Sequence, residues 1–162
     1  MPETMTGSGD QPRARNRQAQ IAARRRARRM ALQALYQWQL NPQDAVEIEL
    51  QFRAEQEMDK VDVDYFHHLL QGVVEEQDTL DGYIEPYLDR PLAELDPVER
   101  AILRLGAYEL ARRPEVPYVV AINEGVELAK TFGAEQSHRY VNGILDKLAA
   151  RLRGAEVRAR GG

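Results

Sequence analysis

The stretch LDPVERAILRLGAYEL, residues 95–110, contains the clearest helix start in the sequence. Asp96 stands where an N-cap residue belongs, Pro97 follows at the first helical position, and Glu99 comes three residues after the cap. Apolar residues then recur at helical spacing, at Val98, Ile102, Leu105 and Leu110. The stretch therefore predicts a helix with one face in a core.

Helical spacing recurs on both sides of this stretch. Further helices are expected over five segments. The first begins between Arg17 and Ile21 and ends at Leu40, and the next covers residues 43–57. A third begins at Asp62 or Asp64, with an end left open near Gly82 and Pro86, and the last two cover residues 118–132 and about 135–153. In the second segment we expect Val46, Leu50 and Ala54 to be buried. No segment combines strand-like alternation with hairpin turn residues, so the predicted fold class is all-α.

The composition limits the class of protein. A chain of 162 residues with 43% hydrophobic and 30% charged residues has the size and balance of one globular domain. It has no cysteine, which excludes disulfides, thiolate zinc sites and cysteine nucleophiles. The first 20 residues lack a secretory apolar segment, and no apolar run approaches the ~18 residues of a membrane span. We expect a cytoplasmic protein without membrane association.

Positive charge is concentrated at the two ends of an acidic chain. The net charge is −4, yet residues 1–40 carry +6 and residues 151–162 carry +3, which leaves −13 for the middle. This asymmetry is typical of a basic edge that meets a polyanion beside an acidic body with another task.

Five of the six residues from Arg24 to Arg29 are arginines. On a helical wheel the apolar stripe comprises Ala27, Met30, Ala31, Ala34, Leu35 and Trp38. Arg25, Arg26 and Arg29 lie away from this stripe, while Arg24 and Arg28 flank it. The run is therefore predicted to be the exposed face of a helix.

A solvated surface is one explanation of the run, but three features favour polyanion binding. The charges have no acidic partner at i±4, they are expected near the positive end of the helix dipole, and all are arginines, whose planar fork suits phosphate. An anionic membrane would need an outward apolar face. DNA is less easily excluded than a membrane. RNA is favoured because arginine-rich segments are a familiar way to bind it.

Several motifs together resemble the NusB family of bacterial transcription antitermination factors. The resemblance rests on RRRARRMALQALYQWQL, DVDYFHHLLQGV, LDGYIEPYL, VERAILRLGAYEL and, above all, VPYVVAINEGVELAKTFGAEQSHRYVNGILDKL. It covers roughly residues 24–152. It implies an all-α fold of two small helical bundles packed together, an N-terminal subdomain at 17–90 and a C-terminal subdomain at 91–153. Outside the resemblance, the Gly-, Pro-, Ser- and Thr-rich residues 1–16 are expected to be a polar disordered tail, and residues 154–162 a flexible tail.

The resemblance also implies an activity without catalysis, cofactor or metal. Members of the family bind the boxA RNA element of ribosomal RNA leaders together with NusE, which is a small-subunit ribosomal protein, and join an elongating RNA polymerase complex. Position by position, RNA contacts fall on Arg24, Arg25, Arg26, Arg28, Gln136, Arg139 and Tyr140. Positions that face NusE fall on Tyr36 and Glu99.

Two departures from the family pattern concern the RNA side. Arg29 extends the run where relatives can be acidic, and Gln136 is neutral where an acidic residue is common. The acidic middle suits a basic partner such as NusE, and its candidate residues are Glu94, Asp96, Glu99 and Glu109.

Two other functions remain as alternatives. Similar helical domains precede the catalytic domain of some ribosomal RNA cytosine methyltransferases, and because only about ten residues follow the last expected helix, this alternative requires the sequence to be a fragment of such an enzyme. The other alternative is an anion-binding scaffold without sequence preference. Among other residues, the adjacent His67 and His68 are not expected to share a metal, and Gly125 and Gly143 are expected where helix backbones approach closely.

Overall fold

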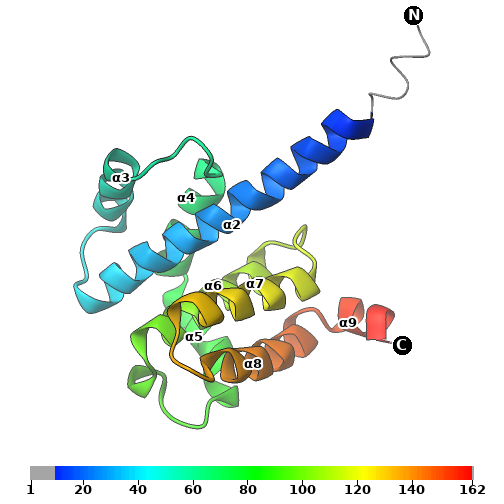
Figure 1. The fold of residues 1–162 in the computed structure, drawn as a ribbon. Helices are drawn as coiled ribbons and strands as arrows, with labels where there is room; N and C mark the ends of the chain where they lie inside the picture. The colour runs from blue at the N-terminus through cyan, green and yellow to red at the C-terminus, as the bar shows by residue number, and fades with distance from the viewer. Residues whose placement is uncertain (1–9, 162) are drawn as a thin grey trace, which may run out of the picture.

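The computed structural model describes residues 10–161, which form helices and their connections (Figure 1). The helices are α2 (Asp10–Leu40), α3 (Ala45–Glu55), α4 (Val63–Glu75), α5 (Gln77–Ile84), α6 (Pro97–Arg112), α7 (Tyr118–Phe132), α8 (Ser137–Leu152) and α9 (Gly154–Gly161), with 3-10 turns at Glu85–Tyr87 and Leu92–Glu94. This part of the chain contains no strand, so the predicted all-α fold is confirmed. No helix within it is long and apolar enough to cross a membrane.

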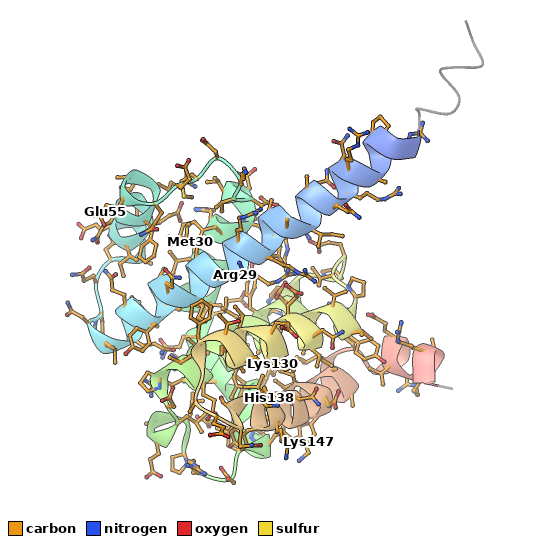
Figure 2. The ribbon with its side chains drawn as sticks, in the orientation of Figure 1. Arg29, Met30, Glu55, Lys130, His138 and Lys147 are labelled. Atoms are coloured by element: carbon orange, nitrogen blue, oxygen red, sulfur yellow. The ribbon has the colours of Figure 1, made fainter. Side chains whose placement is uncertain are left out.

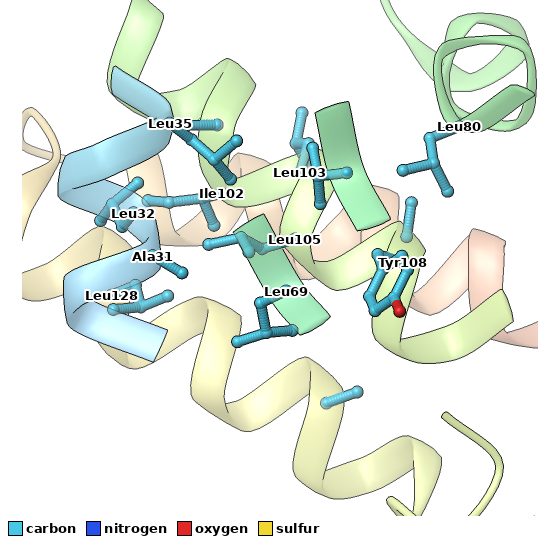
Figure 3. Close-up of a cluster of buried hydrophobic side chains, with 14 of the residues drawn as sticks. Ala31, Leu32, Leu35, Leu69, Leu80, Ile102, Leu103, Leu105, Tyr108 and Leu128 are labelled. Atoms are coloured by element: carbon cyan, nitrogen blue, oxygen red, sulfur yellow. The ribbon is translucent and has the colours of Figure 1, made fainter. Parts of the chain in front are cut away.

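The helices form two groups that meet at α6 (Figure 1). The C-terminal half of α2 packs against α3, α4 and α6, while α7 and α8 pack against each other and against α6. The N-terminal half of α2 projects beyond both groups. Buried side chains from α2, α4, α6 and α7 belong to one continuous core, seen in Figure 3 at Leu35, Leu69, Leu103 and Leu128. The predicted subdomain boundary near residue 90 stays a prediction.

Helix α6 begins as its sequence predicts. The Asp96 side chain accepts hydrogen bonds from the backbone N–H groups of Val98 at 2.9 Å and Glu99 at 3.4 Å, and Pro97 is the first helical residue. The burial of α6 is more extensive than the predicted stripe, because every residue from 101 to 110 is buried. This helix is surrounded by five others, so it has no solvent face over these residues.

The buried part of α6 carries two charged side chains. One of them, Arg104, forms an ion pair with a residue of α5. Its Nε and Nη2 donate to the two carboxylate oxygens of Asp81 at 2.8 and 2.9 Å, and its Nη1 donates to the side-chain oxygen of Gln39 at 2.9 Å. A buried guanidinium needs such partners because an unpaired buried charge is strongly destabilising. Arg104 therefore ties α2, α5 and α6 together.

The close packing of α6, α7 and α8 depends on two glycines that face one leucine. A Cβ on Gly106 of α6 would lie 2.7 Å from Leu145 Cδ2, and a Cβ on Gly125 of α7 would lie 2.7 Å from Leu145 Cδ1. Close packing at Gly125 is therefore present, but its neighbour is the Leu145 side chain and not a helix backbone as predicted. The same prediction for Gly143 is wrong, because a Cβ there would meet nothing within 4 Å.

Two predictions about the N-terminal half of the chain also need correction. Helix α2 begins at Asp10, before the predicted start at 17–21, so part of the segment predicted as a disordered tail is helical. Helix α3 buries Ile48 and Phe52 instead of Val46 and Leu50, which are 55% and 61% exposed, and Ala54, which is exposed as well. Both faces of α3 have apolar residues at helical spacing. Packing against α2 and α4 selects one of them, and the ring centres of Phe52 and Phe66 lie 6.2 Å apart on that side.

The segment predicted as a flexible C-terminal tail is helical over residues 154–161. Its Glu156 carboxylate accepts a hydrogen bond from the backbone N–H of Tyr118 at 2.9 Å, at the start of α7, where Pro117 offers no side-chain cap. Arg153, just before α9, donates to the carbonyl oxygens of Leu110 and Val116 at 2.7 and 2.9 Å. These partners lie about forty residues away in sequence, and local patterns do not reveal them.

We expect Gly125→Ala to lower the free energy of unfolding by about 1–3 kcal/mol, the usual cost of overpacking a core. The Leu145 side chain cannot move away from the new methyl group without approaching Gly106. Urea denaturation would measure the change. Gly143→Ala is the matched control and should stabilise the protein by up to about 1 kcal/mol, because alanine is the better helix former in open space. Equal stability of Gly125→Ala and the wild type would contradict this packing argument.

Candidate nucleic-acid interface

The arginine run lies in the middle of α2, and its members have different environments. The side chains of Arg25, Arg26 and Arg29 are exposed, Arg24 is half-buried, and Arg28 is buried at 5% exposure. On the side of α2 that faces the core, alanines including Ala27 and Ala31 are fully buried. The predicted outward orientation therefore holds for three of the five arginines.

Arg28 is held by two buried carboxylates. Its Nε and Nη2 donate to the Glu109 carboxylate of α6 at 2.9–3.1 Å, and its Nη1 donates to Glu124 Oε1 of α7 at 3.3 Å. Burial alone would lower the pKa of Arg28, but Glu109 and the other neighbouring groups raise it well above its ordinary value. The guanidinium is therefore permanently charged and already occupied. This corrects the prediction that Arg28 contacts RNA, and it also removes Glu109 from the candidates for a partner surface.

Tyr65 of α4 completes this buried cluster. Its hydroxyl donates a hydrogen bond to Glu109 Oε2, and both burial and the Glu109 charge raise its pKa. The guanidinium carbons of Arg24 and Arg113 lie 4.2 and 5.1 Å from the centre of the Tyr65 ring, within the range of cation–π attraction. The cluster of Arg28, Tyr65, Glu109 and Glu124 thus joins α2, α4, α6 and α7.

Two of the arguments that favoured polyanion binding change with the structure. The run lies at least fourteen residues after the start of α2 at Asp10, whereas the helix-dipole effect is confined to the first turn. Acidic residues also approach the run from other elements: Asp62 lies 3.6 Å from Arg24, and Glu124 lies 3.1 Å from Arg25. The run is therefore partly neutralised within the protein.

The charges that remain available are on the outer side of α2. Arg26 makes a 3.5 Å hydrogen bond to the Lys60 carbonyl oxygen but no ion pair with any residue in the described part of the chain. Arg29 has neither a hydrogen-bond nor an ion-pair partner among residues 10–161. With Arg25, whose side chain is 55% exposed despite its ion pair, these residues form an exposed arginine face. We call Arg25, Arg26 and Arg29 the arginine face.

A groove of about 450 Å³ runs between α2 and α7 beside this face. Arg25 and Arg29 lie on its α2 wall, and Asn123, Lys130 and Thr131 lie on its α7 wall. Figure 2 labels Arg29 and Lys130 on these two helices. Glu124 and Glu127 also line the groove. It therefore combines cations, amide and hydroxyl groups with two carboxylates, and its α2 wall is the more positive. Lys130 and Thr131 were not singled out from sequence, because only tertiary packing places them opposite the run.

The second predicted RNA edge lies at the start of α8. Gln136 precedes the helix with φ of 72°, the one positive φ of a non-glycine residue in the described chain, and both Gln136 and Arg139 are exposed. Tyr140 is half-buried, and its hydroxyl donates to Asp89 Oδ1 at 2.8 Å. Burial and this hydrogen bond raise the pKa of Tyr140. Its ring is therefore held in one orientation, with Asp89 beside it.

Tyr36, one of the two predicted partner-facing residues, lies on an apolar groove of about 240 Å³, lined by Leu32, Gln33, Tyr36, Val98 and Phe132. Tyr36 and Phe132 are each more than a third exposed. Glu99 follows Val98, and its carboxylate accepts a 2.6 Å hydrogen bond from the Ser137 hydroxyl. Tyr36 therefore lies close to the start of α6, the helix that carries Glu99, the other predicted partner-facing residue. Sequence reasoning missed Phe132, whose position directly before Gly133 is its only signal.

The described residues contain no group of three or more histidine and acidic side chains arranged to hold a metal ion. His67 instead lies 2.8 Å from Glu49 through its Nδ1.

Comparison with known proteins shows matches over most of the chain. The model of the NusB family matches residues 25–150. The chain is 60% identical over 139 residues to the transcription antitermination protein NusB of Alcanivorax borkumensis, covering 86% of this chain and 93% of the relative. It is 58% identical to NusB of Edwardsiella ictaluri, covering 82% and 95%. Curated relatives at this level of identity are thus named for antitermination.

Two solved structures have the same fold. Thermotoga maritima NusB superposes with a TM-score of 0.69 at 32% identity, covering 77% of this chain and 89% of that structure. A crystal structure of the antitermination factors NusB and NusE in complex with double-stranded RNA matches with a TM-score of 0.65 at 27% identity, covering 76% and 93%.

We expect Arg28→Ala to lower the free energy of unfolding by about 3–5 kcal/mol, because it leaves Glu109 charged and unpaired in the core. Arg29→Ala removes the same charge one residue along the helix and should change stability by no more than about 0.5 kcal/mol. Urea unfolding of both variants at neutral pH makes the comparison. A stable Arg28→Ala variant would show that this guanidinium is not structural.

Proposed function

The chain belongs to the NusB family of transcription antitermination proteins, and from this premise we propose that it binds boxA RNA of ribosomal RNA leaders together with NusE. The resulting complex joins elongating RNA polymerase in the cytoplasm and allows it to read through terminators. The observation that carries the proposal is the arginine face beside the α2–α7 groove.

The arginine face suits a nucleic-acid backbone. Arg25, Arg26 and Arg29 present guanidinium groups along one side of a rigid helix, and such groups bind phosphate through paired N–H donors. Lys130 adds a further cation on the opposite wall of the groove. RNA is the favoured polyanion because the related NusB–NusE crystal structure contains RNA. Arg24 contributes charge from its half-buried position, whereas Arg28 acts by holding α2 in place.

Base discrimination is assigned to the edge at the start of α8 and to NusE. Tyr140 has a partly exposed ring that its hydrogen bond to Asp89 holds in place, and stacking of a base on an aromatic ring contributes about 1–3 kcal/mol. Arg139 and Gln136 are exposed beside it. The neutral Gln136 avoids repulsion of phosphate at this edge.

NusE is assigned to the groove that contains Tyr36. An exposed tyrosine beside Phe132 and Val98 has the character of an interface anchor, because aromatic residues are enriched where binding energy is concentrated. Glu99 directly follows Val98, which lines this groove, and a carboxylate there favours a basic protein.

The methyltransferase alternative receives no support from the relatives, which are named for antitermination. The sequence-independent scaffold is separated from boxA recognition by experiment. We expect boxA RNA, with NusE present, to bind more tightly than a scrambled RNA of equal length at the same salt concentration. Equal affinity for the two RNAs would replace boxA recognition with general polyanion binding.

We expect simultaneous replacement of Arg25, Arg26 and Arg29 by alanine to reduce the slope of log affinity against log salt by about 2, since each phosphate neutralised on a single strand contributes about 0.7. Fluorescence anisotropy with boxA RNA over a series of salt concentrations would measure the slope. Arg53→Ala is the control, because this exposed arginine lies on α3, away from the groove. An unchanged slope in the triple variant would remove the arginine face from RNA binding.

We expect Tyr36→Asp to weaken NusE binding by about 2 kcal/mol, roughly thirtyfold, with little change in stability because Tyr36 is 39% exposed. Isothermal titration of NusE gives the dissociation constant, and circular dichroism monitors folding. Gln37→Ala changes the neighbouring residue and serves as the comparison. If Tyr36→Asp binds NusE as the wild type does, this groove is not the NusE site.

A further inference from the structure

The N-terminal half of α2 is a helix that leaves the body of the protein (Figure 1). From residue 12 to residue 21 every side chain is exposed except Ala14, which is half-buried. The family match begins only at Arg25, so the family assignment gives this segment no role. The segment is nevertheless continuous with the arginine face, because α2 runs unbroken from Asp10 to Leu40.

Packing does not account for this half of the helix. Most helical stability in proteins comes from burial of an apolar face, and the only large apolar side chain here, Ile21, is 54% exposed. Local sequence accounts for its helical form: Pro12 lies in the first turn, and Ala14, Gln18, Ala19 and Gln20 are good helix formers. The segment is thus built to be helical without contributing to the core.

The charge of the segment is strongly positive. Arg13, Arg15 and Arg17 are all exposed, and Asp10 is the only acidic residue of α2. Neither Arg13 nor Arg17 has an ion-pair partner among the residues that the structure describes. Like charges three or four residues apart on a helix repel each other, so this arrangement carries a cost in the unbound protein. A bound polyanion would offset that cost.

The arginines of this segment are in register with those of the run. Arg15, Arg26 and Arg29 share one side of the helix at spacings of 11 and 14 residues, and Arg13, Arg17 and Arg24 share the other at 4 and 11. At 1.5 Å per residue, these arginines extend over about 24 Å along the helix axis, from Arg13 to Arg29. A nucleic-acid backbone that follows the helix can therefore contact arginines of both the projecting segment and the run.

A second groove lies where the projecting segment leaves the body. It has a volume of about 510 Å³ and is lined by Asn16, Gln20 and Arg26 of α2 and by Asp59 and Lys60 of the connection before α4. Asn16 and Gln20 offer amide donors and acceptors, and Lys60 adds a cation beside Arg26. This groove connects the projecting segment to the arginine face through a shared residue, Arg26.

We propose that residues 13–20 of α2 form a phosphate-binding arm that holds RNA nucleotides flanking the segment bound at the arginine face. The inference rests on the proposed RNA-binding function and extends it beyond residues 25–150, which the family model matches. RNA is preferred over a protein or a membrane because the arm has no continuous apolar face for either, while its guanidinium groups match phosphates.

The test uses the full chain with NusE present and two RNAs, boxA alone and boxA extended at each end by about eight nucleotides, which exceeds the length of the arm. The variant replaces Arg13, Arg15 and Arg17 with alanine, which preserves helix propensity. Gln18→Ala, in the same segment, is the matched control. Fluorescence anisotropy titrations over a series of salt concentrations give the affinity and the salt slope for each combination of protein and RNA.

For the wild type and Gln18→Ala, we expect the extended RNA to bind on the order of tenfold more tightly than boxA alone, with a salt slope steeper by about 2. The triple variant should lose this gain while binding boxA alone like the wild type. Replacement of the same three residues by lysine should retain most of the gain, because the effect is one of charge.

Two other results would overturn the proposal in different ways. If the wild type binds boxA but gains nothing from the extension, or if the triple variant gains as much as the wild type, the arm does not bind RNA and the proposed function stands. If the wild type with NusE binds neither RNA, both the proposed function and the arm are wrong.

Discussion

The buried pairing of Arg28 with Glu109 and Glu124 is the constraint on which the rest of the structure depends. It joins α2 to α6 and α7 through charge-assisted hydrogen bonds, and the Tyr65 hydroxyl adds α4. Because the Arg28 guanidinium is fixed toward the interior, the rotation of α2 about its own axis is fixed as well. Arg25, Arg26 and Arg29 must then face outward, and the groove against α7 follows from the same orientation.

A single run of arginines thus combines a structural and a surface role. Arg28 is required by buried carboxylates, and Arg24 stacks over Tyr65, so these two belong to the packing of the protein. Arg25 is intermediate between these two roles, because it forms an ion pair with Glu124 while its own side chain is exposed to solvent. Exposed ion pairs contribute about 0–1 kcal/mol, so a phosphate can replace Glu124 as the partner of Arg25 at little cost. The acidic residues of α7 therefore organise the basic face without blocking it.

Local signals in the sequence predicted the features that local interactions determine. The Asp96 cap, Pro97 and the apolar stripe of α6 could be read from adjacent residues, and the motif resemblance supplied the family. Three other features could not be read from adjacent residues, because each depends on residues from distant parts of the chain. They are the side of α3 that is buried, the cap that Glu156 provides for α7, and the partners of Arg28. The expected effect of the helix dipole on the arginine run is absent for a related reason. Helix α2 begins at Asp10, earlier than predicted, so the run lies far from the N-terminal end of the helix.

Helix α7 connects two of the surfaces to which binding is assigned, the groove beside the arginine face and the groove that contains Tyr36. Its middle supplies Glu124 to Arg25 and Arg28, and its last residue, Phe132, lines the groove that contains Tyr36. The last turn of α7 therefore contributes residues to both grooves, and this helix packs against both α6 and α8. Position between two sites does not by itself establish allosteric coupling. Proximity alone is sufficient to explain joint binding, because a protein and an RNA held side by side on one rigid element raise each other's effective concentration and can make contacts with each other.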